Sequence, residues 1–258
     1  MICRQIIALI KLSFLDLYRR KELFVLLVLG LVLIAPLSML RPFGQAGATR
    51  YMNEIAMLMI WVFSFIIALG ASARLYPPEF ESRTIYPLLA KPVSRGTTLL
   101  GKYLGALLTA ISALAIFYTL YAIPNGIVGN GWFPLILWQA FILHCGFVAI
   151  VVALGLLGSL LVTSSANITI TTIVVSTMFL FGRRLPDYIA TQGAPAKWII
   201  GAAHAICPHV EFFDLRQRLV HSWDVISWQV CGLALAYAIC YSSACLWLAW
   251  LALRRKKL

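Results

Sequence analysis

The sequence predicts an all-α integral membrane protein with six transmembrane helices. Composition is the first observation behind this prediction. Of the 258 residues, 62% are hydrophobic and 12% are charged, whereas soluble domains average about 25% charged residues. The second observation is a series of apolar segments of roughly 18 to 30 residues, each long enough to cross a hydrocarbon core. Together they exclude a water-soluble domain, and we treat residues 1–258 as a single transmembrane domain.

Six segments have the length and polarity expected of a spanning helix. None contains Asp, Glu or Arg, and the one Lys, Lys102, lies near a boundary. The expected spans are residues 23–40, 55–73, 99–123, 132–162, 166–182 and 225–253. Six spans put both ends of the chain on the same side of the membrane.

The basic residues predict which side that is. Fourteen of the 21 Lys and Arg lie on the side of the termini and seven lie opposite. Cytoplasmic loops carry the excess of Lys and Arg in membrane proteins, so we expect both termini in the cytoplasm. The net charge of +12 is spread over loop ends instead of gathering on one face, and it does not indicate nucleic-acid binding.

Residues 1–22 precede the first span and are amphipathic. On a helix, Ile7, Ile10 and Phe14 share one face, while Arg4 and Lys11 lie on the other. This pattern predicts an elbow helix that lies in the inner leaflet. A helix packed against the first span remains the alternative, because several leucines fall on the polar side.

The expected cytoplasmic loop 74–98 contains a second short helix. Pro77 and Pro78 are typical of a helix start, and Glu79 and Glu81 are favourable in the positive first turn. An apolar ridge follows, made of Phe80, Thr84, Ile85, Leu88 and Leu89. A short helix with such a ridge, held between two spans, suits docking into a groove on a soluble partner. The alternative is an amphipathic loop that rests on lipid headgroups.

An ordered motif crosses this loop and enters the third span. It consists of Glu79, Glu81, Thr84, Leu88, Leu89, Pro92, Val93, Ser94, Arg95, Gly101 and Lys102. With two later stretches, Leu154–Ser159 and Pro208–Arg216, it resembles the type-2 ABC transporter permeases, particularly the small six-span subunits of bacterial exporters. The chain departs from this pattern at Arg83, where many members of that family carry Gly.

The resemblance implies the membrane-spanning permease subunit of an ATP-driven exporter in the bacterial cytoplasmic (inner) membrane. Such subunits work as dimers, here expected to be homodimers, with separate ATPase subunits. The chain would then be no enzyme and bind no cofactor, since ATP and Mg²⁺ sit on the ATPase. The implied coupling residues are Glu79, Phe80, Glu81, Arg83, Thr84, Ile85, Leu88, Leu89, Pro92 and Arg95.

The fifth span is rich in hydroxyl and amide side chains. We expect Asn167, Thr169, Thr172 and Ser176 to line the substrate pathway or the dimer interface, because such groups bond between helices in membranes. Hydroxyls that bond to carbonyls of their own helix are the alternative.

The outer loop 183–224 is expected to form short helices in the outer leaflet before the last span, because residues 210–219 are amphipathic. It also contains His204, Cys207, His209 and Glu211, whose side chains are ligands for zinc or copper. The spacing matches no usual metal motif. No metal ligand is therefore assigned, and the sequence leaves metal binding open.

Other functions find less support. Gly96–Lys102 matches most of a phosphate-binding loop, but Tyr103 occupies the position of the Mg²⁺-binding hydroxyl; we expect Lys102 to reach the headgroups instead. An ion-coupled secondary transporter usually needs an acidic residue in a span. An intramembrane enzyme acting on lipid or peptide needs a nucleophile beside a base, and His144 and Ser159 are separated by roughly 22 Å of helix rise.

Overall fold

The computed structural model describes residues 46–82, 94–127, 133–221 and 223–256, with scattered positions between 7 and 32. In this part of the chain, five helices are long and apolar enough to span a membrane. They are α3 (Ala46–Ala73), α6 (Arg95–Ile127), α7 (Leu135–Leu161), α8 (Ser164–Phe181) and α12 (Trp228–Arg255). The expected elbow 1–22 and first span 23–40 lie outside the continuously described residues.

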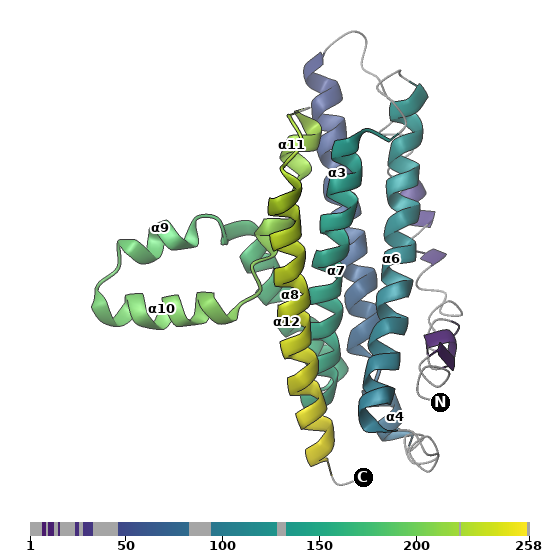
Figure 1. Ribbon diagram of the computed structural model, residues 1–258, viewed down its shortest axis with the longest axis vertical. Helices are drawn as coiled ribbons and strands as arrows, with labels where there is room; N and C mark the ends of the chain where they lie inside the picture. Colours follow the sequence, from purple (N-terminus) through teal and green to yellow (C-terminus); the bar gives the residue numbers. More distant parts are fainter. Residues whose placement is uncertain are drawn as a thin grey trace.

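The long helices form a bundle around α7 (Figure 1). Helix α12 packs along α7 over the most extensive contact, and α3, α6 and α8 also contact α7. Large side chains in the core include Phe117, Phe147, Ile150 and Leu156, all fully buried. Because α7 is covered on most sides, its near-uniform hydrophobicity reflects burial among helices as well as contact with lipid.

The five described spans lie where the hydropathy pattern predicts them. Helices α7, α8 and α12 begin and end within about three residues of the expected segments. Helices α3 and α6 are longer than the apolar segments they contain, since α3 already begins at Ala46 and α6 continues to Ile127. Hydropathy marks the apolar part of a helix, whereas backbone hydrogen bonding continues into its polar ends.

The segment between α8 and α12 is mostly helical. It contains α9 (Leu185–Ala190), α10 (Ala194–Ile206), the 3₁₀ helix η1 (Val210–Phe213) and α11 (Arg216–Val220). Proline in the first turn starts both α9 and α10. The prediction of short helices in this loop is confirmed. Helices α9 and α10 project sideways from the bundle as an arm (Figure 1), whereas η1 contacts α7 and α8, and α11 contacts α3 and α7.

Glycines on α7 allow two neighbouring helices to approach closely. A Cβ at Gly155 would overlap the Ser72 hydroxyl of α3, and a Cβ at Gly158 would overlap the Asn167 amide of α8. Small residues at helix contacts are the usual basis of close packing in membrane proteins. Gly155 and Gly158 therefore act in helix packing.

We expect Gly155→Ala to lower the free energy of unfolding by about 1–3 kcal/mol, because the new methyl group overpacks the contact between α3 and α7. The measurement is the thermal unfolding temperature in detergent. Gly232→Ala on α12 is the matched control, since its Cβ would meet nothing within 4 Å. Equal stability of both variants would contradict the packing described here.

Candidate functional site

A buried lysine joins three segments at one end of the bundle. Lys102 of α6 is 5% exposed, and its ammonium donates to the carbonyl of Leu75 at 3.1 Å and to the carboxylate of Glu79. The same ammonium lies 4.2 Å from the centre of the Tyr76 ring. The expectation that Lys102 reaches the headgroups is wrong, because these partners already satisfy its charge inside the protein.

Glu79 belongs to α4 (Pro77–Glu81), the short helix that the two prolines predict. Pro77 lies in the first turn with Glu79, and the Ser82 hydroxyl closes the other end by donating to the Pro78 carbonyl at 2.6 Å. Helix α4 follows α3 after a tight turn, and the ion pair between Glu79 and Lys102 ties it to α6. A force on α4 would therefore act directly on α3 and α6.

The end of α12 reaches the same place. Arg95, the first residue of α6, donates to the backbone carbonyls of Leu253 at 3.0 Å and Arg254 at 3.1 Å. A cation at a helix C-terminus is favoured by the helix dipole. Lys256 lies 4.2 Å from the centre of the Phe80 ring of α4. We call this meeting point of α4, the start of α6 and the end of α12 the junction (Figure 1).

The structure brings together only some of the predicted coupling residues. Glu79, Phe80 and Arg95 all lie in the junction. For Glu81 the structure describes the backbone alone. The remaining coupling residues, Arg83, Thr84, Ile85, Leu88, Leu89 and Pro92, lie outside the described residues.

Phe80, which the sequence places on the docking ridge, packs against other residues of the same protomer. Its ring stacks on Tyr76, with centroids 5.9 Å apart, and its side chain packs against the hydrophobic core. Tyr76 is fully buried. Phe80 thus contributes to anchoring α4 on the bundle.

The predicted pathway residues of α8 separate into two groups. Asn167 is buried and donates to the Gly155 carbonyl of α7 at 2.7 Å. Thr169 is exposed and bonds to the Ser165 carbonyl of its own helix at 3.0 Å, while Thr172 and Ser176 are half-buried. Asn167 therefore packs within the protomer, and Thr169 is the residue of this set that faces outward.

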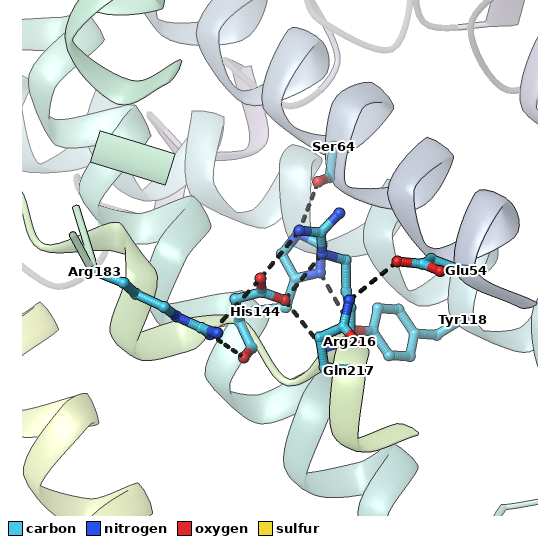
Figure 2. Close-up of polar contacts among 8 residues, drawn as sticks. Glu54, Ser64, Tyr118, His144, Arg183, Arg216 and Gln217 are labelled. Carbon is cyan, nitrogen blue, oxygen red and sulfur yellow. Dashed lines mark hydrogen bonds and ion pairs between the residues drawn. The ribbon is translucent and has the colours of Figure 1, made fainter. Parts of the chain in front are cut away.

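A hydrogen-bonded histidine lies in the middle of the bundle (Figure 2). His144 is fully buried, with Nε2 2.8 Å from the Ser64 hydroxyl and Nδ1 3.2 Å from the Tyr118 hydroxyl. Trp61 stacks on the imidazole at a centroid distance of 4.3 Å. Ser64 is 0% exposed, so a substrate has no access to this serine and histidine. The arrangement is a buried histidine with a hydrogen-bond partner at each ring nitrogen.

Charged side chains of the segment between α8 and α12 pack against the spanning helices α8 and α3. Asp214 receives two hydrogen bonds from the Arg216 guanidinium, at 2.9 and 3.0 Å, and its backbone carbonyl accepts one from Arg183. The Arg216 guanidinium lies 4.5 Å from the centre of the Phe179 ring of α8 and 5.8 Å from that of Trp61 of α3. Figure 2 shows Arg216 beside His144. The sequence predicts outer-leaflet helices in this loop but not this cluster, because hydropathy does not indicate which charges pair with one another.

Gln217, the residue after Arg216, extends this polar cluster to α3. Gln217 donates to the Glu54 carboxylate at 3.0 Å (Figure 2). Glu54 is close to the start of α3. The cluster thus fixes α11 on the bundle through polar contacts on both sides of Arg216.

The family model described as "ABC-2 family transporter protein" matches residues 8–215. The chain belongs to the ABC-2 transporter family. It is a multi-pass membrane protein and a transport subunit of an ABC transporter rather than a catalytic one. No curated protein matches this permease.

We expect Asp214→Asn to lower the free energy of unfolding by about 2 kcal/mol, because a mostly buried Arg216 guanidinium would lose its counter-charge. Asparagine keeps one oxygen for the hydrogen bond from the Arg216 backbone N–H, but it removes the negative charge and one of the two oxygens that accept from the guanidinium. The measurement is thermal unfolding in detergent. Asp187→Asn on the exposed face of α9 is the control, and an equal effect of both substitutions would show that the cluster contributes nothing.

Proposed function

We propose that this permease is the membrane-spanning subunit of a bacterial ABC exporter. Two copies form a homodimer around the substrate pathway, and a separately encoded ATPase binds each copy. The subunit lies in the cytoplasmic membrane with both termini in the cytoplasm. Membership of the ABC-2 family, which implies association with an ABC ATPase, supports this proposal.

The observation that carries the proposal is the way α4 is held. Its Glu79 is bound to the buried Lys102 of α6, and the preceding turn supplies the Leu75 carbonyl to the same ammonium. Arg95 adds the end of α12. An ATPase that grips α4 and the residues after it would move the ends of three spanning helices together, which is what transmission of a mechanical step requires.

The homodimer draws support from the outer helices. Only 22% of the apolar window of α8 and 28% of that of α12 are buried within the protomer, against 67% for α7. Lipid or a second copy must cover the rest. Thr169 lies on the uncovered side of α8, but its hydroxyl is satisfied by the Ser165 carbonyl of the same helix, so the support for a second copy comes from the uncovered apolar surface.

An intramembrane enzyme has less support. The structure does place Ser64 beside His144, a pair that the sequence did not predict. Ser159, the serine that the sequence offered, bonds instead to the Leu156 carbonyl of its own helix. Both members of the new pair are fully buried among aromatic rings. They act as a packing and hydrogen-bonding unit, and the transport function stands.

We expect Ile85→Asp and Leu88→Asp to abolish co-purification of the ATPase in mild detergent, because a charge on the docking ridge prevents its burial in a groove. Phe80 is unsuitable for this test, since it also packs on Tyr76. The measurement is mass spectrometry of proteins that co-elute with the permease, scored for an ABC-type ATPase.

The control is Tyr188→Asp, which places the same charge on an exposed aromatic residue of α9. This variant should retain the ATPase at the wild-type level. Retention of the ATPase by Ile85→Asp and Leu88→Asp would overturn the assignment of the coupling region. Loss from all three variants would show that the effect is not local to that region.

A further inference from the structure

Three potential metal ligands meet where the arm returns to the bundle. His204 lies in the last turn of α10, His209 precedes η1, and Glu211 lies in its first turn. One donor atom from each side chain lies within 4.8 Å of the others. Cys207 and Pro208 end α10 between the two histidines, so the chain reverses and brings them together despite a spacing that matches no usual metal motif.

The carboxylate of Glu211 is buried and half satisfied. Its side chain is 7% exposed, and Oε1 lies 3.1 Å from Nδ1 of His209. Oε2 is buried and has no hydrogen-bond partner among the described residues. Buried carboxylate oxygens are normally bonded, because desolvation without a partner is costly. The orphaned oxygen therefore indicates a ligand.

His204 presents a second orphaned atom. Its Nε2 is buried and likewise has no partner within the described part of the chain. The rings of His204 and His209 lie 4.5 Å apart between centroids. A protonated His209 would pair with Oε1 of Glu211 but would leave Oε2 and the His204 nitrogen unsatisfied. A single cation between the three side chains would satisfy both.

The neighbouring arginines are engaged elsewhere. Arg216 forms its described ion pair with Asp214, and so does Arg183, at 3.9 Å. No described lysine or arginine forms an ion pair with Glu211. The charge of this carboxylate is thus not balanced by a lysine or arginine of the described chain.

The surroundings hold the three ligands in place. The backbone N–H of His209 donates to the Tyr237 hydroxyl at 2.9 Å, and the Tyr241 hydroxyl donates to the Ile206 carbonyl at 3.1 Å. Both tyrosines belong to α12. Gly182 leaves room for the carboxylate, since a Cβ there would lie 2.7 Å from Oε2 of Glu211. Such support from neighbouring residues is typical of a built metal site.

We propose that His204, His209 and Glu211 bind one Zn²⁺. Two imidazoles and a carboxylate are a common zinc ligand set and leave a fourth position for water. The metal joins α10 to η1 and thereby fastens the arm to the bundle.

The test measures Zn²⁺ binding by isothermal titration calorimetry on the full-length permease, purified in detergent without a polyhistidine tag and stripped with a chelator. We expect one Zn²⁺ per chain. His204→Ala, His209→Ala and Glu211→Gln should each weaken binding roughly tenfold or more. His221→Ala is the control, because that ring bonds to the Gln217 carbonyl outside the cluster, and it should bind as the wild type does.

A second measurement on the wild-type protein covers the case in which a variant does not fold. Zn²⁺ should protect His204 and His209 from modification by diethyl pyrocarbonate, read by mass spectrometry, and should leave His221 as reactive as before. Absence of stoichiometric binding would overturn the site. Wild-type affinity in the folded His204, His209 and Glu211 variants, or no protection of His204 and His209, would do so as well.

Discussion

The buried ammonium of Lys102 is the constraint on which the proposed transmission end depends. A lysine that is 5% exposed must keep its partners, because an unpaired charge is strongly disfavoured away from water. Its partners are the Leu75 carbonyl, the Glu79 carboxylate and the Tyr76 ring. Leu75 and Tyr76 lie in the turn from α3 into α4, and Glu79 lies in α4 itself. Helix α4 therefore cannot leave α6 without exposing or orphaning this charge.

The same principle organises the other polar groups. Arg216 and Asp214 come from a connecting segment, yet the guanidinium lies against the rings of Phe179 and Trp61. The ion pair with Asp214 stabilises the Arg216 guanidinium beside these aromatic rings, and Gln217 extends the polar contacts to Glu54. Among the described side chains, Glu211 and His204 depart from this principle, since each has a buried polar atom without a hydrogen-bond partner, as do the hydroxyls of Tyr76 and Ser242. A bound cation would give the buried Glu211 oxygen its missing partner.

Local chemistry explains what could be predicted from the sequence. Long apolar segments fixed the five described spans, and Pro77 with Pro78 fixed the start of α4. These signals lie within a few consecutive residues. Lys102 bonds to residues 23 and 27 positions away in the sequence, and Asn167 bonds to a residue 12 positions away. The rings beside the Arg216 guanidinium belong to α8 and α3. Hydropathy carries no information on such pairings. The sequence therefore places Lys102 wrongly at the headgroups, and it gives no sign of the hydrogen bond from Asn167 to Gly155.

Transmission of force from an ATPase requires that the junction face the cytoplasm, where the ATPase can reach it. The direct measurement is labelling of single cysteines, in a background without the six native ones, with a membrane-impermeant maleimide. Pro78→Cys, at an exposed position of α4, should react only after the cells are permeabilised, and Asp187→Cys on α9 should react in intact cells. Labelling of Pro78→Cys in intact cells would put the junction outside and contradict the proposed transmission.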